Sequence, residues 1–406
     1  MFYGHCPWEK SGQAKEKRYD SPEADKSEKG FGINSNFEVP FKNILMHYPM
    51  KKHNFGAGPS ILPATVFEEG SKAIKEFGST GLSILEISHR SKAFEQVVEE
   101  SKALAAELFG LSSDYEVLFL TGGASTQFFM VPMNLLGAEE SAGYLDTGSW
   151  SSKAIAEARL FGSVEVLASS KSTNYSYIPR DFEVPAHLQY LHLTSNNTIF
   201  GTQYHWWPST DVPLVADMSS DIFSRPVDVS RFGLIYAGAQ KNIGPAGVTL
   251  VIARKDLISK AKRQLPTMLN YKTFADNNSL YNTPPVYAIY LSMLTMRWIK
   301  TLGGLQAMES MNRSKAGLFY AELDRNPLFK GVVGAVEDRS LMNATFNTVQ
   351  PELEKRFLEL CNEAGIIGIE GHRSAGGFRA SMYNALPEES VRVLVETMRA
   401  FEKQFG

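Results

Sequence analysis

Seven short apolar runs, separated by segments with helical periodicity, constrain the fold of this chain more than any other feature. The runs cover residues 117–120, 144–146, 164–167, 190–193, 214–216, 234–237 and 248–253. Mostly apolar runs of this length are typical of strands that are buried on both faces. Strands that alternate with helices form a mostly parallel sheet with helices on both sides, and their connecting loops meet at one edge. The sequence therefore predicts an α/β fold around a seven-stranded sheet.

The last hundred residues have a different pattern and predict a smaller α+β domain. We expect strands near residues 341–349, 365–369 and 378–383, and helices at 351–364 and 387–405. The expected division of the chain is a segment at 50–64 that joins the small domain, a large domain at 65–300, and the small domain at 301–406.

The first 49 residues differ from the rest of the chain. They are rich in Lys, Glu, Ser and Gly and have no periodic apolar pattern, which predicts a disordered extension. Its acidic residues argue against an organellar presequence. We hypothesise that Met50 is the natural start and that residues 1–49 are an upstream in-frame extension.

Charge and cysteine content exclude several classes of protein. The formal net charge is −3, so neither a nucleic-acid surface nor a basic membrane patch is indicated. Cys6 and Cys361 lie far apart and outside any metal-binding motif, which argues against a disulfide framework and a bound metal. No apolar run reaches the ~20 residues of a membrane span. We expect a cytoplasmic protein.

The stretch IYAGAQKNIGPAG contains Lys241 in a turn of small residues directly after an apolar strand. Ligands of α/β proteins usually bind at such strand ends. Upstream, another apolar run ends in Asp217. A pyridine cofactor such as pyridoxal phosphate needs an amine for its imine and an anion beside its ring nitrogen, and these two residues supply both. The alternatives are a solvated turn lysine and an aspartate that caps a turn.

Other candidate residues follow neighbouring strands. Ser125 lies where the glycine-rich loop TGGASTQ enters a helix, and a helix N-terminus can bind phosphate. Trp150 offers an indole that can stack on a flat ring, and Thr198 can donate a hydrogen bond. The alternatives are an ordinary helix cap, a core tryptophan and an unremarkable loop threonine.

Two pairs of adjacent cations and one further arginine suit an anionic substrate, because arginine binds carboxylate or phosphate with two parallel hydrogen bonds. These residues are His89, Arg90, His372, Arg373 and Arg379. For Arg90 the alternative is an ion pair with Glu86 or Glu95, and for the other arginines it is solvation.

The segment ADMSSDIFSRPVDVSRFGLIYAGAQKNIGPAG resembles the phosphoserine aminotransferases, a family of class V, fold-type I enzymes that depend on pyridoxal phosphate. The resemblance extends from about Asn54 (NFGAGPSILP) to the C-terminus and includes SILEISHRS, GSW, YNTPP and GHRSAGGFRASMYNA. It implies a homodimer with shared active sites. The implied reaction moves an amino group between L-glutamate and 3-phosphohydroxypyruvate, giving O-phospho-L-serine and 2-oxoglutarate in serine synthesis. Use of 4-phosphohydroxythreonine, in vitamin B6 synthesis, stays open.

The resemblance also implies a role for each site residue. Lys241 binds the cofactor aldehyde, Asp217 pairs with its ring nitrogen, Trp150 stacks on the ring, and Thr198 bonds the phenolic oxygen. The implied phosphate contacts are Ala124, Ser125, Gln240 and, from the partner subunit, Asn282 and Thr283. Arg379 takes the substrate α-carboxylate, and the distal anion is surrounded by His89, Arg90, His372 and Arg373. Some members of the family have an arginine where this chain has Ser125, and a serine where it has Ala57. The resemblance therefore implies that this chain lacks one phosphate contact and has a weaker substrate contact.

Three other functions agree less well with these residues. A cysteine desulfurase needs a nucleophilic cysteine on a mobile loop, whereas Cys361 has the helical spacing of a core residue. An alanine–glyoxylate aminotransferase does not call for two His-Arg pairs. A non-catalytic cofactor carrier or phosphate sensor does not need Lys241 or the substrate arginines.

Overall fold

The central element is a seven-stranded sheet with the strand order β2-β8-β7-β6-β5-β3-β4. The computed structural model describes residues 52–406, so the expectations for residues 1–49 and for Met50 concern residues outside the described part. The strands are β2 (Tyr115–Leu120), β3 (Ser141–Asp146), β4 (Ser163–Ser169), β5 (Leu191–Thr194), β6 (Leu214–Asp217), β7 (Phe232–Gly238) and β8 (Thr249–Arg254). All seven predicted strands are present. Only β8 runs antiparallel to its neighbours, β2 and β7, so the predicted fold class is confirmed.

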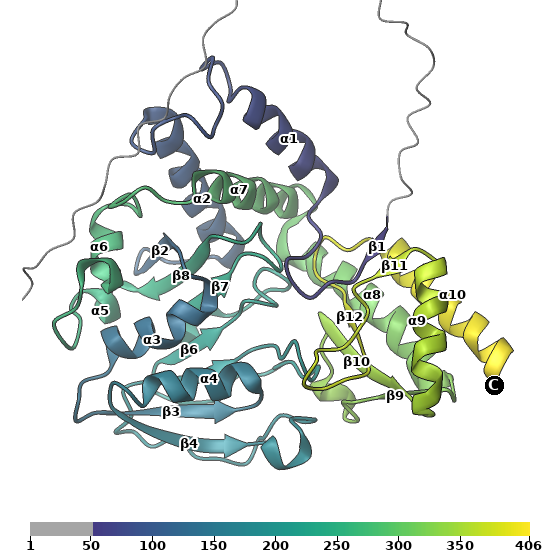
Figure 1. Cartoon of the computed structure of the whole chain (residues 1–406). Helices are drawn as coiled ribbons and strands as arrows, with labels where there is room; N and C mark the ends of the chain where they lie inside the picture. Colours follow the sequence, from purple (N-terminus) through teal and green to yellow (C-terminus); the bar gives the residue numbers. More distant parts are fainter. Residues whose placement is uncertain (1–51) are drawn as a thin grey trace, which may run out of the picture. The chain divides into compact units, whose positions relative to one another are not determined.

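Alternation along the strands divides the large core into two layers. In β2, Val117 and Phe119 belong to one apolar cluster, and Leu118 and Leu120 belong to the other. This follows from the two-residue period of a strand. The first cluster lies under α1 (Ala64–Lys75), α2 (Lys92–Phe109) and α7 (Val286–Thr301). The second lies under α3 (Gly123–Leu135), α4 (Ser149–Ala158), α5 (Lys255–Ile258) and α6 (Tyr271–Asp276). Helices thus cover both faces of the sheet (Figure 1).

Local signals set the ends of the helices. The hydroxyl of Ser91 accepts a bond of 3.3 Å from the Phe94 amide at the start of α2, and Gly110, with φ 61°, ends it. The glycine-rich loop was expected to enter its helix at Ser125, but α3 begins at Gly123, because Gly122 takes a φ of 94° that lets the chain reverse two residues earlier. None of the helices in residues 52–406 combines the length and apolar character needed to cross a bilayer.

A second, smaller sheet has the order β12-β10-β9 and lies beside α8 (Gly304–Arg325), α9 (Glu354–Glu363) and α10 (Glu388–Phe405). Its strands are β9 (Phe329–Gly331), β10 (Asn343–Thr348) and β12 (Phe378–Ser381). The sequence prediction missed β9, because three residues are too few to show a period. The expected strand at 365–369 is reduced to β11 (Ile366–Ile367).

The first described residues pair with the C-terminal part of the chain. Strand β1 (His53–Asn54) runs parallel to β11, and Phe55 is buried in the apolar cluster of the small sheet. The amphipathic α8 also contributes to that cluster through Phe319. These contacts support the expected division at residues 50–64, 65–300 and 301–406, which we retain as a proposal.

Candidate active site

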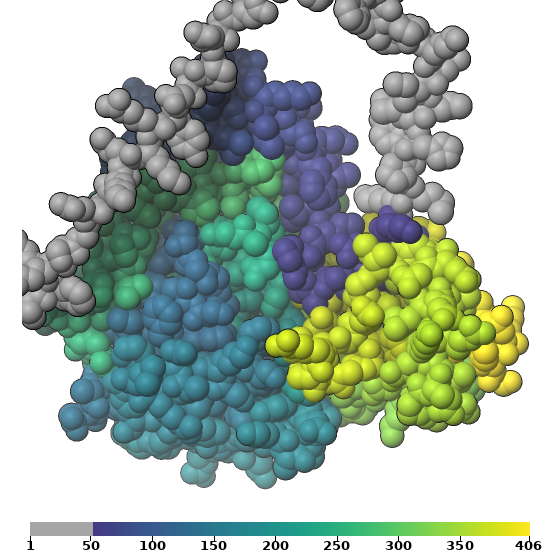
Figure 2. Space-filling model, viewed as in Figure 1, coloured from purple at the N-terminus to yellow at the C-terminus, as the bar shows by residue number. Residues whose placement is uncertain are grey.

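A cavity of about 350 Å³ opens at the carboxyl edge of the parallel strands. It collects most of the residues that the sequence singled out, from segments far apart in the chain. Those lining it are Ala124, Ser125, Trp150, Thr198, Asp217, Gln240, Lys241, His372 and Arg379. Ala57 and Gly58 form part of its wall. In the space-filling view, the purple N-terminal residues lie between the teal and yellow surfaces of the later chain (Figure 2).

Lys241 and Asp217 come from the ends of neighbouring strands, as predicted. Asp217 is the last residue of β6, and Lys241 lies in the turn after β7, which pairs with β6. One oxygen of the Asp217 carboxylate accepts bonds from the Ser219 amide, at 2.9 Å, and the Ser219 hydroxyl, at 2.6 Å. Within the described residues, no hydrogen bond is recorded to its other oxygen. The Asp217 side chain is therefore held in place with one oxygen free for a ligand.

Burial affects the protonation of both groups. It lowers the pKa of the Lys241 amine below its ordinary value, an effect that the Asp217 charge opposes and the Arg379 charge reinforces. Burial raises the pKa of the Asp217 carboxyl, against the opposing effects of Lys241 and the Ser219 hydrogen bonds. A lowered lysine pKa increases the fraction of neutral, nucleophilic amine. An amine with this property in a cavity is a candidate for covalent catalysis.

The N-terminus of α3 faces the cavity through Gly122, Gly123, Ala124 and Ser125. The first amides of a helix have no partner within the helix and carry the positive end of its dipole, so they can bind an anion. A Cβ atom on Gly122 would lie 1.8 Å from the Thr126 hydroxyl oxygen. The loop therefore requires glycine there for both its backbone angle and its space.

Trp150 and Thr198 contact each other across the cavity wall. The indole nitrogen of Trp150, in the first turn of α4, donates a 3.0 Å bond to the Thr198 hydroxyl. The sequence predicted both residues separately but gave no sign of this bond. Nitrogen Nζ of Lys241 lies 5.8 Å from the centre of the Trp150 ring, so the aromatic surface and the amine border the same space. Thr198 lies in the loop beyond β5, four residues past the end of the strand.

Two of the predicted cations reach the cavity from the small sheet and the loop before it. Arg379, on β12, donates a 2.9 Å bond to the Thr198 carbonyl, and its buried Nε has no hydrogen-bond partner among the described residues. His372 also lines the cavity, and burial lowers its pKa, with Arg379 and Arg373 adding to the effect. Arg373 is exposed on the same loop and does not line the cavity. These positive groups have no carboxylate within ion-pair distance in residues 52–406, which favours an anionic ligand.

Besides Arg373, four predicted residues lie outside the cavity of their own chain: His89, Arg90, Asn282 and Thr283. His89 and Arg90 occupy a turn between α1 and α2, and Thr283 is exposed in the loop before α7. Arg90 forms no ion pair with Glu86 or Glu95 in the described part of the chain, so the alternative role given above for this arginine is wrong. Burial lowers the pKa of His89, with a smaller effect from Arg90.

Ser219 was missed by the sequence prediction, although it holds Asp217 in place. Its signal is the pattern Asp-X-Ser, because an aspartate often accepts a bond from the amide two residues later. Lys153 was also missed. It is exposed on α4, and its Nζ lies 4.5 Å from the centre of the Trp150 ring. The described residues contain no group of three or more His, Cys, Asp or Glu side chains placed to hold a metal ion.

The donor set of the cavity fits pyridoxal phosphate. The cavity contains the Lys241 amine, whose pKa is lowered, the oxygen of Asp217 that accepts no recorded bond, and the N-terminal amides of α3, which have no partner within the helix. These match the aldehyde, the ring nitrogen and the phosphate of that cofactor. The cavity volume is within the range of small-molecule sites.

Comparison with known proteins gives a consistent result. The family described as aminotransferase class-V matches residues 52–394. Phosphoserine aminotransferase of Flavobacterium johnsoniae is 56% identical over 356 residues, which are 87% of this chain and 100% of that protein. The solved phosphoserine aminotransferase from Bacillus circulans subsp. alkalophilus has 47% identity and a TM-score of 0.86, covering 88% of this chain and 99% of that one. The enzyme with bound PLP from Trichomonas vaginalis has 34% identity and a TM-score of 0.82, covering 86% and 100%. The chain therefore belongs to the class-V aminotransferases, within the phosphoserine aminotransferase family.

Proposed function

We propose that this protein transfers an amino group between L-glutamate and 3-phosphohydroxypyruvate, giving 2-oxoglutarate and O-phospho-L-serine. The proposal places it in serine biosynthesis with pyridoxal phosphate as its cofactor. The observation that carries it is the cavity in which Lys241, Asp217 and Arg379 meet, in a chain that matches phosphoserine aminotransferases over nearly their whole length. Reaction with 4-phosphohydroxythreonine uses the same anion contacts and is a second candidate substrate.

The residues around the cavity have distinct roles in this proposal. Asp217, Trp150 and Thr198 hold and orient the cofactor ring, and Gln240 and the N-terminus of α3 hold its phosphate. When bound, pyridoxal phosphate supplies an electron-accepting ring and carries the amino group between the two half-reactions. The Lys241 amine would hold the cofactor and would move a proton from and to the substrate Cα.

Substrate recognition depends on the cations at the cavity mouth. Arg379 binds the α-carboxylate, and its bond to the Thr198 carbonyl fixes the direction of the guanidinium. His372 and Arg373 bind the distal phosphate of one substrate or the side-chain carboxylate of glutamate. An anion beside His372 favours its protonated form, so the pKa of His372 rises on binding.

The active site is completed by a second copy of the chain in this proposal. His89, Arg90, Asn282 and Thr283 do not line the cavity of their own chain, and the partner subunit supplies them. Apolar side chains on α1 and the segment that follows it support a self-association surface there. Phe67 is 55% exposed and Leu85 is 62% exposed, and Ile74 and Leu82 in the same stretch of chain are exposed as well. A cytoplasmic location is part of the same proposal.

The alternative desulfurase function lacks a nucleophile among the described residues. Cys361 is buried on α9, and burial raises the pKa of its thiol to about 12. Such a thiol is unreactive at neutral pH. Cys6 lies outside the described part of the chain.

An assay of three amino donors tests the proposal. With 2-oxoglutarate as acceptor, O-phosphoserine should form glutamate far faster than alanine does, and cysteine should release no sulfide. The purified protein should also bind pyridoxal phosphate and change its absorbance when O-phosphoserine is added. Equal rates with alanine, or no spectral change on adding the cofactor, would contradict the proposal.

A further inference from the structure

Asn242 directly follows the candidate catalytic lysine but does not line the cavity. Its side chain is 3% exposed and joins two segments from opposite sides. Nitrogen Nδ2 donates a 2.9 Å bond to the carbonyl of Ser220, and Oδ1 accepts a 3.1 Å bond from the amide of Asn384. Ser220 lies three residues after Asp217, and Asn384 follows β12 of the small sheet. One amide side chain thus connects the lysine turn to the aspartate segment and to the small domain.

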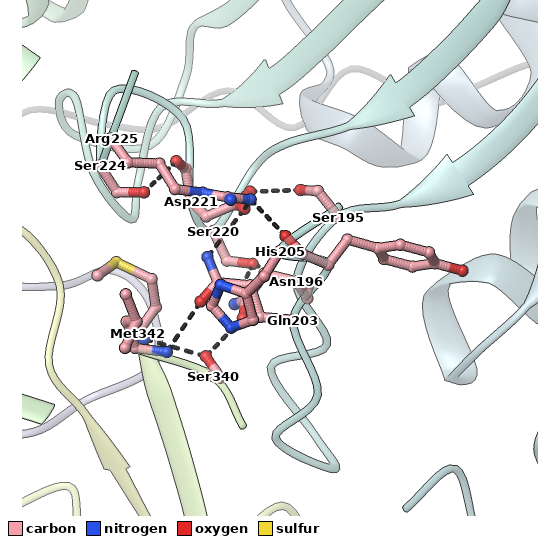
Figure 3. Close-up of polar contacts among 12 residues, drawn as sticks. Ser195, Asn196, Gln203, His205, Ser220, Asp221, Ser224, Arg225, Ser340 and Met342 are labelled. Carbon is pink, nitrogen blue, oxygen red and sulfur yellow. Dashed lines mark hydrogen bonds and ion pairs between the residues drawn. The ribbon is translucent and has the colours of Figure 1, made fainter. Parts of the chain in front are cut away.

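The Ser220 side of this bridge is fixed by other contacts. The Ser220 hydroxyl donates to the Asn196 carbonyl at 3.0 Å and accepts from the Asn196 side chain at 2.8 Å. The next residue, Asp221, accepts hydrogen bonds from the Ser195 hydroxyl and from Gln203, the latter at 3.1 Å (Figure 3). The Ser220 carbonyl therefore has a position that does not depend on Asn242.

The Asn384 side is fixed by α8. Asn384 donates a 3.0 Å bond to the Phe223 carbonyl and accepts a 2.9 Å bond from Asn312. Nζ of Lys315, which is 1% exposed, donates to the carbonyls of Met382, Tyr383 and Asn384 at 3.1, 2.7 and 3.4 Å. A buried lysine that bonds three successive carbonyls holds this segment as a rigid support.

We propose that Asn242 is a positioning residue that sets Lys241 relative to Asp217 before the cofactor binds. This inference rests on the proposed function, since it assumes that the cofactor joins these two groups. Two further contacts of the turn come from Ser60, whose hydroxyl donates to the Lys241 carbonyl and whose amide donates to the Gln240 carbonyl at 2.9 Å. Asn242 ties the turn after Lys241 to the aspartate segment, and Ser219 makes a second link before it by accepting a 3.1 Å bond from the Gly238 amide at the end of β7. A site arranged in advance binds its ligand without having to order it.

The test compares N242A with wild-type protein and with N326A as a matched control. Asn326 is also buried and donates bonds of 3.1 and 3.2 Å to Glu322 and Met398, but it lies in the core of the small domain. Both variants leave buried polar groups unpaired, so both should unfold at a lower temperature. Titration of each apoprotein with pyridoxal phosphate should give a dissociation constant raised about tenfold in N242A, one hydrogen bond's worth of affinity, and unchanged in N326A.

Borohydride reduction followed by peptide mass spectrometry identifies the attached lysine. Wild-type protein should carry the cofactor on Lys241, and N242A should reach the same labelling only at a higher cofactor concentration. If N242A lowers the unfolding temperature as N326A does but binds the cofactor like wild type, Asn242 is merely structural and the inference is wrong. Wild-type protein without a label on Lys241 would overturn the proposed function and this inference together. If N242A does not fold, N384A, which removes the two side-chain anchors of the Asn384 segment to Phe223 and Asn312, should raise the same dissociation constant, and an unchanged value would overturn the inference.

Discussion

At the scale of single residues, the sequence predicted most of the residues that line the cavity but not the hydrogen bonds between them. Lys241 and Asp217 could be predicted because each ends an apolar strand, and parallel strands bring their ends together. The bond between Trp150 and Thr198 could not, because it joins residues 48 positions apart and depends on side-chain directions. Asn242 could not be predicted either, since its partners Ser220 and Asn384 come from two distant segments.

Replacement of Lys241 by alanine should abolish transamination, because no other described amine lines the cavity. The protein should remain folded, since removing a lysine whose pKa is lowered by burial relieves a desolvation penalty. Steady-state assays and circular dichroism would check both parts. K272A is a suitable control, because Lys272 is an exposed lysine on α6 that pairs with Asp276 and should leave the chemistry intact. Turnover by K241A at the wild-type rate would refute the role of Lys241.

Replacement of Arg379 by lysine should reduce kcat/KM for O-phosphoserine by about thirtyfold, equivalent to about 2 kcal/mol, because an ammonium group cannot form two parallel bonds to a carboxylate. R373K is the matched change on an exposed arginine of the neighbouring loop, and we expect a smaller loss. The comparison uses kcat and KM for each variant. Equal losses in the two variants would argue against a special role for Arg379.

At the scale of helices and strands, length decided what the sequence could show. All seven strands of the large sheet were predicted, because apolar runs that alternate with helical segments give a clear signal. Strands β1 and β9 have two and three residues and were missed, since their existence depends on the partners they pair with. Helix α3 begins two residues before the predicted start, because Gly122 adopts a positive φ that glycine tolerates and other residues adopt only with strain.

Replacement of Gly122 by alanine should disturb the N-terminus of α3. The positive φ costs about 1–2 kcal/mol for a residue with a Cβ atom, and that atom would also collide with Thr126. Cofactor affinity and the unfolding temperature should both fall. In the control G78A, φ is +59° and nothing lies within 4 Å of the added atom, so stability should fall while cofactor affinity is unchanged. Unaltered cofactor binding in G122A would show that the α3 N-terminus does not hold the phosphate.

Lys315 should make stability depend on pH. Burial lowers its pKa from 10.5 to about 7. Between these values the unfolded chain binds more protons than the folded chain, so the free energy of unfolding should rise with pH, and below pH 7 this dependence should vanish. One proton corresponds to a slope of about 1.4 kcal/mol per pH unit.

Urea unfolding of wild-type protein and K315M from pH 7 to pH 10 would measure this slope. It should disappear in K315M and persist in K272M, where an exposed lysine paired with Asp276 is removed. The same slope in wild type and K315M would mean that Lys315 is already accessible to water.

At the scale of the whole molecule, the proposed dimer predicts that two inactive variants can restore each other. In a mixed dimer of K241A and R90A, one site receives both defects and the other receives none. Random mixing should therefore recover about one quarter of wild-type activity, because half of the dimers are mixed and each has one intact site. The variants would be mixed under conditions that allow subunit exchange. No recovery, with exchange shown by mass spectrometry, would place Arg90 in the same subunit as its Lys241 or outside the site.

Residues 53–58 belong at once to the edge of the small domain and to the wall of the cavity, through the pairing of β1 with β11 and the position of Ala57 and Gly58. A single cut by a protease in this segment would disturb both the pairing of β1 with β11 and the cavity wall. In a digestion followed over time, loss of cofactor retention and loosening of the C-terminal residues should therefore progress together. An affinity tag fused next to this segment would not be a neutral addition.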